Sequence, residues 1–230
     1  MGSLHWTGAK TVLVMQTLVV GPGQRMLIRY AAAGILPVKP GLFHLTPGIA
    51  VQTTLRTKQL LLRPFEVGDV ADALSYRDDK EFARFLSHIP QPFTRNDAEA
   101  FVALNIAEPW DRSPTFAVVL GGRVIGTVNL EVDTQARTAM LGYAIGRPWW
   151  ERGIAAEAAQ AVMAWGIRTF GLTRVWASTD VRHSRSQRVL EKLGMRREAI
   201  LPDHHLGRDR EVIDEVLYGS NLAATSTGSP

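Results

Sequence analysis

Hydrophobic and polar positions follow regular periods only after about Val51. Before that point glycine and proline recur between Gly21 and Gly48, and neither the strand period of two nor the helix period of 3.6 persists for long. We therefore predict that residues 1–50 form an irregular, dispensable N-terminal extension and that residues 51–222 form the folded domain. The small and polar residues 223–230 predict a disordered tail.

From Val51 onward the periods predict one α/β domain with a mixed sheet. Apolar runs bounded by glycine and proline predict strands, and apolar residues three or four apart predict helices. In chain order we expect a strand centred on 60–63, helices over 69–85 and 95–107, strands over 115–120, 123–132 and 138–145, a helix over 154–170, a strand over 173–180, a helix from 184 to 194, and strands over 196–201 and 212–218. A polar loop, residues 202–210, is expected between the last two strands.

Residues with special roles at element ends support these boundaries. Thr94 followed by Asp97, and Ser184 followed by Gln187, have the spacing of a capping box that starts a helix. Gly171 is placed to end the long helix in the left-handed conformation. Two glycines, Gly121 and Gly122, supply the positive φ of a tight hairpin turn.

Composition limits the chemistry that this domain can perform. Lys and Arg number 26 against 22 Asp and Glu, a formal net charge of +4, and the basic residues are scattered instead of forming a stripe. This favours anionic small molecules over nucleic acid as partners. Because the chain has no cysteine, disulfides, thiolate metal sites and a cysteine nucleophile are excluded.

The most apolar N-terminal run, Thr11 to Val20, is about half the length that spans a bilayer. As a signal peptide it would be cleaved near Ala31 to Ala33, but Arg25 and Arg29 stand between the run and that segment. We therefore expect a cytoplasmic protein with no membrane partner.

The stretch WWERGIAAEAAQAVMAWG places a glycine turn directly before an alanine-rich helix. The first turn of a helix has N–H groups without partners and a partial positive charge. Gly153 lets a ligand approach the main chain, and Ile154 and the alanines after it carry no polar side chain that competes for these N–H groups. Since Arg152 adds a positive charge, the stretch predicts a site for a diphosphate.

Gly153 has a second interpretation, as an ordinary loop glycine before a buried helix. A lone glycine turn does not distinguish the two. The chain has neither the Gly-rich fingerprint of dinucleotide folds nor the Lys-Ser/Thr ending of a P-loop, so nucleotide hydrolysis has no support.

A longer run carries a resemblance to a known family. From Gly142 to Gly194, GYAIGRPWWERGIAAEAAQAVMAWGIRTFGLTRVWASTDVRHSRSQRVLEKLG resembles the core of the GNAT N-acetyltransferases, particularly the branch named for the ribosomal-protein acetyltransferases RimJ and RimL. Its most specific parts are WWERGIAAEA and RSQRVLEKLGM. The similarity extends more loosely from about Thr54 to Leu222, and residues 1–50 lie outside it.

The resemblance implies a GNAT fold, with a mixed, mostly antiparallel central sheet flanked by helices and with two central strands splayed apart. It also implies acetyl-CoA as co-substrate and no metal. An amine then attacks the thioester directly, a base takes its proton, and an acid protonates the departing thiolate. The matching cofactor-binding residues are Tyr143, Ala144 and Ile145, whose backbone pairs with the pantetheine arm, and Arg152, Gly153, Ile154, Ala155 and Ala156 at the pyrophosphate.

The sequence departs from the family pattern at three positions. Trp150 stands where the family often has Gln or Arg, so Arg152 is expected to supply the charge. His183 replaces the Asn of an Asn-x-x-Ser signature; it is a candidate for contacting CoA or relaying a proton, or else an ordinary surface-loop histidine. Leu190 stands where many members carry an acidic Tyr, and similarity to the RimL branch assigns the acid role to Ser186.

The general base is open among several residues. Glu131 ends a predicted strand near the point where the central strands should part, and its carboxylate could accept the ammonium proton if burial raises its pKa. The alternative for Glu131 is a solvated edge carboxylate. Rivals from the closing strands are Asp214, His204 and His205.

Aromatic residues are divided between core and acceptor pocket. Trp165 and Trp176 are assigned to the core. Helical spacing such as that of Phe82 and Phe85 is more typical of core, although both remain candidates. The candidates for the pocket wall are Phe82, Phe85, Trp110 and Trp149.

We expect an N-acetyltransferase that moves acetyl from acetyl-CoA to a primary amine, with a protein or peptide N-terminus preferred. A small-molecule amine such as an amino acid, polyamine or antibiotic is the alternative acceptor, and other acyl groups are open. A rival of another class is a non-catalytic CoA-binding sensor. Nucleic-acid binding is supported only by net charge, and a homodimer is open.

Overall fold

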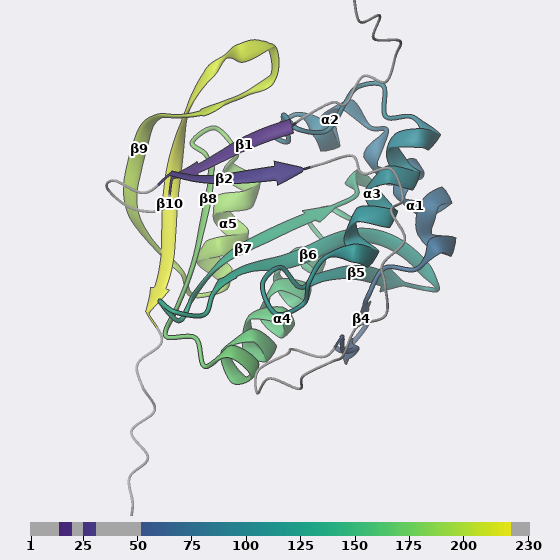
Figure 1. Ribbon diagram of the computed structural model, residues 1–230, viewed down its shortest axis with the longest axis horizontal. Helices are drawn as coiled ribbons and strands as arrows, with labels where there is room; N and C mark the ends of the chain where they lie inside the picture. Colours follow the sequence, from purple (N-terminus) through teal and green to yellow (C-terminus); the bar gives the residue numbers. More distant parts are fainter. Residues whose placement is uncertain (1–13, 20–24, 31–51, 222–230) are drawn as a thin grey trace, which may run out of the picture. The chain divides into compact units, whose positions relative to one another are not determined.

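The structure, a computed structural model, describes residues 14–19, 25–30 and 52–221, in two units that span 1–45 and 46–230. In the first unit, β1 (Val14–Val19) and β2 (Arg25–Tyr30) form an antiparallel two-stranded sheet, drawn in purple in Figure 1. The prediction of an irregular extension was therefore wrong for these strands. That the extension is dispensable stays a prediction, which deletion of residues 1–50 would test, and the tail lies outside the described residues.

The second unit holds an eight-stranded sheet in the order β3-β4-β5-β6-β7-β8-β10-β9 (Figure 1). Only the β7–β8 pair is parallel, so the sheet is mixed and mostly antiparallel, as expected. The strands are β3 (Leu55–Arg56), β4 (Leu61–Arg63), β5 (Thr115–Leu120), β6 (Arg123–Asp133), β7 (Thr138–Ile145), β8 (Arg174–Asp180), β9 (Arg196–Leu206) and β10 (Val212–Asn221). The helices are α1 (Val70–Arg77), α2 (Lys80–Ala83), α3 (Arg95–Ala107), α4 (Ile154–Phe170) and α5 (Ser184–Lys192).

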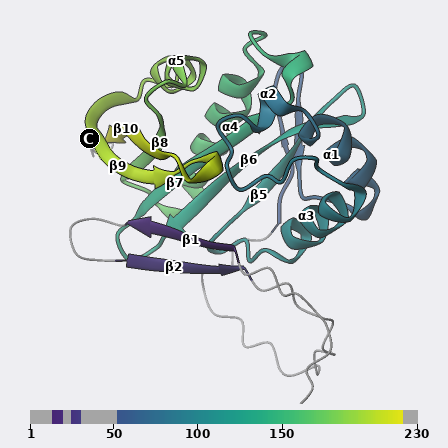
Figure 2. The same cartoon turned by 90° about the horizontal axis from the view of Figure 1, so that it is seen from above.

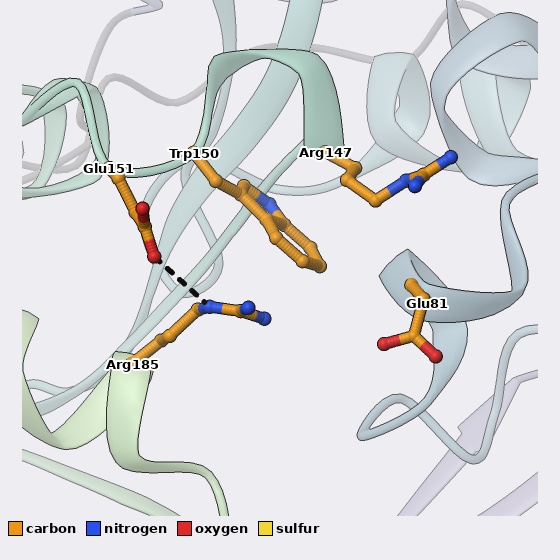
Figure 3. A pocket seen from close by; sticks show the side chains of 5 residues that line it. All are labelled: Glu81, Arg147, Trp150, Glu151 and Arg185. Carbon is orange, nitrogen blue, oxygen red and sulfur yellow. Dashed lines mark ion pairs between the residues drawn. The ribbon is translucent and has the colours of Figure 1, made fainter.

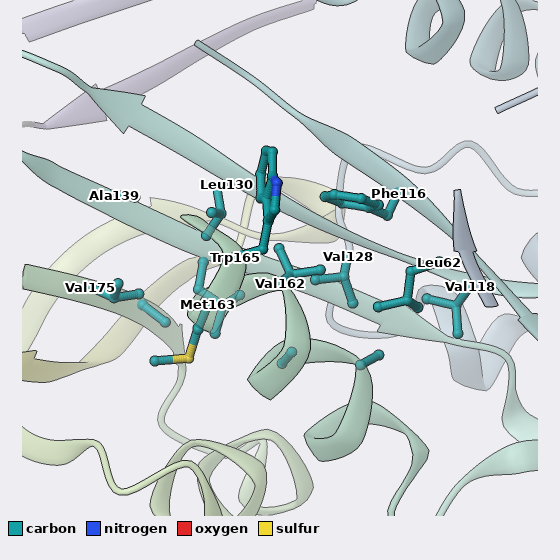
Figure 4. Close-up of a cluster of buried hydrophobic side chains, with 14 of the residues drawn as sticks. Leu62, Phe116, Val118, Val128, Leu130, Ala139, Val162, Met163, Trp165 and Val175 are labelled. Carbon is teal, nitrogen blue, oxygen red and sulfur yellow. The ribbon is translucent and has the colours of Figure 1, made fainter. Parts of the chain in front are cut away.

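Successive residues of a strand point to opposite faces of the sheet. In the central strands both sets of residues are buried, so both faces of the sheet are covered. On β5, Phe116 and Val118 belong to one core cluster, while Ala117 and Val119 belong to another. The first cluster includes residues of α4, which packs on β6 and β7, and Figure 4 shows part of it. The second includes residues of α1 and α3, and Figure 2 shows the sheet between α4 and these two helices.

The tryptophans do not all lie where the sequence predicted. Trp165 is in the core, as expected, whereas Trp176 is half-buried and the prediction for it was wrong. Trp110 was expected in a pocket wall but is only 4% exposed. Its ring makes edge contacts with Phe116 and Trp165, so it belongs to the core.

The two central strands part, as the resemblance implied. β7 pairs with β8 only from Thr138 to Met140, although β7 continues to Ile145 and β8 to Asp180. After Trp176, which is the partner of Met140, β8 pairs with β10 alone among the described strands. The edge of β7 that would face β8 is therefore without a strand partner from 141 to 145.

Three helix predictions are confirmed at both ends or nearly so, and one was wrong. The helix expected from 184 to 194 is α5, which ends two residues earlier, at Lys192. The helices over 95–107 and 154–170 match α3 and α4, and the Thr94–Asp97 capping box is formed. The helix expected over 69–85 is broken into α1 and α2 because Asp79 has extended backbone, and its side chain accepts from the N–H groups of Glu81 and Phe82. A carboxylate in that role starts a new helix.

Two further predictions near the C-terminus were wrong. The polar loop expected over 202–210 begins as strand, because β9 continues to Leu206 past a register shift opposite β10. Ser184 does not cap α5: the N-cap is His183, and the Gln187 amide donates to the Val181 carbonyl at 2.8 Å. Among the described residues, no helix is both long and apolar enough to cross a membrane.

Candidate active site

The turn before α4 presents main-chain N–H groups without protein partners. Glu151 and Gly153 have positive φ values of 60° and 76°, which turn the chain sharply into the helix. Within the described part of the chain, no acceptor bonds the N–H groups of Ile154, Ala155 or Ala156. Unpaired N–H groups at a helix start, together with the helix dipole, favour an anion.

The nearest carboxylate of α4 is turned away from this site. Glu157 accepts hydrogen bonds from the Thr57 hydroxyl at 2.6 Å and from the Gln59 side chain at 2.7 Å. These bonds outweigh burial and lower the pKa of Glu157. The Glu157 carboxylate is thereby fixed beside the loop between β3 and β4. It accepts no hydrogen bond from the first N–H groups of the helix.

Positive charges from α5 lie beside the turn. A Cβ on Gly153 would stand 3.6 Å from the Lys192 Nζ, so the ammonium is close to the turn. Arg185 lies 3.5 Å from the Glu151 carboxylate, between Nε and Oε1. Arg152 is exposed. The turn therefore combines free N–H groups with cations on two elements.

A cavity of about 350 Å³ lies next to the turn. Its lining, shown in Figure 3, is Glu81, Arg147, Trp150, Glu151 and Arg185. The Arg185 guanidinium stands 4.8 Å over the Trp150 ring. The cavity thus joins α2, the turn before α4 and the start of α5, and two of its five lining residues are arginines.

Trp150 also changes the expectation for Ile145. Its indole Nε1 donates to the Ile145 carbonyl at 2.5 Å. The resemblance assigned the backbone of Tyr143, Ala144 and Ile145 to the pantetheine arm, but this carbonyl is already bonded. Of the three residues, Tyr143 and Ala144 are left with no comparable side-chain contact to their backbone among the described residues.

Tyr143 and Ser186 meet across the space where β7 and β8 have separated. The Tyr143 hydroxyl lies 2.9 Å from the Ser186 Oγ and donates to the Ser186 carbonyl at 3.0 Å. Tyr143 packs against the core face covered by α4, and burial raises the pKa of its hydroxyl. The predicted acid therefore has a hydroxyl partner that sequence reasoning placed only in the cofactor site.

His183 is not the surface-loop histidine considered as an alternative. It is half-buried, and its ring stacks on Phe85 with 4.1 Å between centroids. Burial is the main cause that lowers its pKa to about 4; Arg185 and Arg84 add to this, and Asp180 opposes it. His183 is therefore neutral near pH 7, which argues against a proton relay through its charged form.

Glu131 lies at the point where the central strands part. It pairs with Met140 of β7, and Met140 also forms the last pair with β8, at Trp176. Its carboxylate is half-buried and accepts hydrogen bonds from Ser113 at 3.0 Å and Asn129 at 3.3 Å. Burial raises its pKa, which these hydrogen bonds oppose. A carboxylate with a raised pKa suits a general base.

The rival bases have other partners. The His204 Nδ1 lies 2.7 Å from the Glu215 carboxylate, and the His205 Nε2 lies 2.9 Å from the Ser87 hydroxyl. Asp214 accepts from the Asp203 N–H at 3.0 Å. The structure thus brings Tyr143 and Ser186 together, whereas His204 and Asp214 have contacts within the β9–β10 hairpin and His205 contacts the segment after α2.

Segment 83–89, which starts at the last residue of α2, is joined to the turn between β9 and β10. Arg208 Nη2 donates to the carbonyls of Ala83, Leu86 and Ile89 at 3.1, 3.3 and 2.9 Å.

The aromatic residues predicted to line the acceptor pocket have different surroundings. Phe82 is 5% exposed and belongs to the core, and Trp149 is half-buried against both core clusters. Phe85 contacts His183, at the start of α5.

Sequence reasoning missed Lys192, Arg185 and the Tyr143 hydroxyl. Arg185 and Lys192 are seven residues apart on α5, a spacing that puts both on one face of a helix. That signal was present in the sequence, whereas the approach of this face to the turn before α4 depends on tertiary packing. The Tyr143–Ser186 contact has no sequence signal, because it joins residues 43 positions apart.

Comparisons with known proteins agree with this geometry. A family model described as an acetyltransferase (GNAT) domain matches residues 59–196. The uncharacterized N-acetyltransferase YnaD of Bacillus subtilis (strain 168) is 33% identical over 147 residues, covering 63% of this chain and 83% of that protein. A GNAT-family acetyltransferase from Bacillus anthracis, known from a crystal structure, has a TM-score of 0.67 at 26% identity, covering 75% of this chain and 100% of that one.

RimL, a ribosomal L7/L12 alpha-N-protein acetyltransferase solved with coenzyme A, has a TM-score of 0.67 at 15% identity, covering 74% of this chain and 98% of that one. At this identity the likeness concerns the fold alone. The family match spans more than half of the chain, and the splayed strands and the unpaired turn before α4 agree with it. The chain therefore belongs to the GNAT acetyltransferases and is an acyltransferase that transfers acetyl groups.

Proposed function

We propose that the protein acetylates the amine of a protein or peptide N-terminus, using acetyl-CoA in a ternary complex. The observation that carries the proposal is the set of unpaired N–H groups at the start of α4, beside the gap between β7 and β8. The acceptor class in this proposal is that of RimL, an alpha-N-protein acetyltransferase that has the same fold. The same likeness supports the RimJ/RimL branch as part of the proposal.

In this proposal the diphosphate of acetyl-CoA binds the turn before α4. The N–H groups of the turn donate to phosphate oxygens, and cations beside them add charge-assisted contacts. The pantetheine arm follows the unpaired edge of β7. The residues assigned to the cofactor are Tyr143, Ala144, Arg152, Gly153, Ile154, Ala155, Ala156 and Lys192, with the Ile145 carbonyl reached only if Trp150 turns aside.

His183 is kept as a contact for CoA, in its neutral form. It begins α5 directly before the segment that carries Ser186, and its ring is fixed by Phe85. Because its pKa is about 4, its ring nitrogens offer one donor and one acceptor near neutral pH. Its role is therefore to hydrogen-bond.

The proposed reaction uses Glu131 as base and Ser186 as acid. Glu131 takes a proton from the ammonium, so that the free amine can attack the thioester carbon. The new C–N bond forms, the attacking nitrogen loses its second proton to solvent, the C–S bond breaks, and Ser186 gives its proton to the thiolate. Glu131 and Tyr143 lie on opposite faces of the sheet, because Glu131 pairs with Met140, three residues from Tyr143.

A screen of acceptors tests the proposal. Calorimetry first measures acetyl-CoA binding, and release of the CoA thiol is then followed with unblocked peptides, small amines and the same peptides carrying a blocked N-terminus but a free lysine. We expect turnover with unblocked peptides and background rates with the blocked ones. Turnover only with small amines would replace the acceptor class, and binding without turnover on any amine would favour the sensor reading.

A cytoplasmic location and a homodimer stay predictions. Fractionation of cells would test the first, and light scattering of the purified protein the second.

A further inference from the structure

A pair of hydroxyl groups bridges the space between β7 and α5. The Tyr143 hydroxyl lies 2.9 Å from the Ser186 Oγ and 3.0 Å from the Ser186 carbonyl oxygen. β7 has already lost its pairing with β8 at this level, since the last pair is Met140 with Trp176. The contact is therefore a side-chain link between the two elements that flank the gap.

The Tyr143 hydroxyl is held in its neutral form. Its ring packs against the main core cluster, and burial raises its pKa, with Tyr218 adding to the rise and Ser186 opposing it. A neutral phenol has one hydrogen to donate and lone pairs that accept. Tyr143 therefore can donate to only one of the two Ser186 oxygens at a time.

Two arrangements of these hydrogens fit the same heavy atoms. In the first, Tyr143 donates to the Ser186 carbonyl, and the Ser186 hydroxyl donates to Tyr143. In the second, Tyr143 donates to the Ser186 Oγ, and the serine hydrogen is free to point into the gap. Rotation about two C–O bonds interconverts them, because hydroxyl hydrogens rotate freely.

We propose that Tyr143 is a positioning residue that donates to the Ser186 Oγ while Ser186 protonates the departing thiolate. This inference rests on the proposed function. As the C–S bond breaks, the Ser186 O–H bond breaks and an S–H bond forms, which leaves negative charge on the Oγ. The Tyr143 hydrogen bond stabilises that charge, and the second proton, which the attacking nitrogen loses to solvent after the C–N bond forms, is replaced on the Ser186 Oγ from solvent.

A hydrogen bond to a charged oxygen is stronger than one to a neutral oxygen. The Tyr143 contact therefore stabilises the transition state more than the resting enzyme, which is the condition for an effect on kcat. Binding of acetyl-CoA, which precedes the charge, should depend little on it.

The test compares Tyr143→Phe with a matched control. Phenylalanine keeps the buried ring and removes only the hydroxyl. Tyr218→Phe removes a hydroxyl that also contacts α5, through Gln187 and Glu191, but does not contact Ser186. We expect Tyr143→Phe to lower kcat about 10- to 100-fold with the Kd for acetyl-CoA within about threefold, and Tyr218→Phe to keep kcat within about threefold.

A double-mutant cycle separates positioning from a general structural effect. In a Ser186→Ala background, Tyr143→Phe should change kcat by less than about twofold, because its effect passes through the Oγ. Additive losses, or an equal loss from Tyr218→Phe, would overturn the positioning role while acetyl transfer stands. If the wild-type protein transfers acetyl to no amine, the proposed function fails and this inference fails with it.

Discussion

At the residue scale, Glu131 has a half-buried carboxylate and lies opposite Met140, the last residue of β7 that pairs with β8. A base works only when it is deprotonated, so kcat/KM should rise with pH through the Glu131 pKa, which burial places above its ordinary value of 4.5. We expect Glu131→Gln to lose about 100-fold in kcat/KM and to lose that acid limb. Initial rates between pH 4.5 and 8 at subsaturating amine measure both effects.

Glu108 is a matched control for this substitution. It is also half-buried, its pKa is also raised by burial and by Glu131, and it lies at the end of α3 instead of in the sheet. Glu108→Gln should keep the acid limb. An unchanged pH profile in Glu131→Gln would exclude Glu131 as the base.

A second prediction for a single residue concerns the effect of His183 on the free energy of unfolding. Its pKa is about 4 in the folded protein against an ordinary value of 6.5, so below about pH 6.5 the unfolded chain takes up a proton that the folded protein does not. Stability from His183 is therefore present above pH 6.5 and is lost as the pH falls toward 4. Between pH 7 and 5 the loss should be about 2 kcal/mol.

Urea unfolding of the wild-type protein and of His183→Asn at pH 7 and pH 5 measures this contribution. The variant should lose less stability than the wild type over this interval, by about the amount given above. Equal losses in the two proteins would show that His183 keeps an ordinary pKa.

Much of the candidate site could be predicted from residue types, and the rest depends on distance in the fold. Gly153 and the residues after it were found because a helix start needs no tertiary information to expose N–H groups. By contrast, the bond from Trp150 to the Ile145 carbonyl depends on a rotamer, and the stacking of His183 on Phe85 joins segments far apart in the chain. No period or spacing in the sequence encodes either contact.

At the element scale, α4 is flanked by one glycine at each end, and the two glycines have similar backbone geometry. Gly153 and Gly171 have φ values of +76° and +61°, and a Cβ on either would stand 3.6 Å from a cationic nitrogen, of Lys192 or Arg137. Alanine at either position should cost about 1 kcal/mol of unfolding free energy, since left-handed backbone strains a residue with a Cβ. Only Gly153→Ala should weaken acetyl-CoA binding, by about tenfold.

Calorimetry with acetyl-CoA and urea unfolding of both variants measure these effects. Similar stability losses with unequal affinities would separate the ligand contact from backbone strain. If Gly171→Ala weakened binding as much as Gly153→Ala, the turn before α4 would have no special part in binding.

Element boundaries were predictable where one local signal dominates. The long apolar period of α4 and the capping box of α3 set their ends without help from other elements. The break between α1 and α2 was missed because Asp79 also fits a helix interior, and its capping bonds to the N–H groups of Glu81 and Phe82 show only in the structure. The extension of β9 was missed because its polar residues gain strand geometry only by pairing with β10.

At the scale of the whole molecule, the proposed acid and base lie on opposite faces of one sheet, joined by the gap between β7 and β8. Tyr143 and Ser186 meet on the face covered by α4, while Glu131 points to the other face. An acyl donor and an acceptor that approach from different faces can meet in such a gap without sharing a binding surface. The register of β6 with β7 fixes this arrangement, which no single motif contains.

Also at the scale of the whole molecule, we expect Arg208 to affect binding of the amine and not of acetyl-CoA. Its Nη2 donates to three carbonyls of segment 83–89 and so joins the β9–β10 hairpin to the segment after α2. Arg208→Ala leaves these carbonyls without their charged donor, and we expect a loss of about 2 kcal/mol in unfolding free energy. The KM for the amine should rise about tenfold, while the Kd for acetyl-CoA should stay within about threefold.

Arg210→Ala is the matched control, because Arg210 lies in the same short turn, residues 208–210, and makes no hydrogen bond to segment 83–89 among the described residues. Steady-state kinetics with the amine varied at saturating acetyl-CoA, together with calorimetry, separate the two substrates. An unchanged amine KM in Arg208→Ala would place the acceptor elsewhere. A weakened Kd for acetyl-CoA of the same size would mean that the hairpin supports the whole gap and not the acceptor side of it.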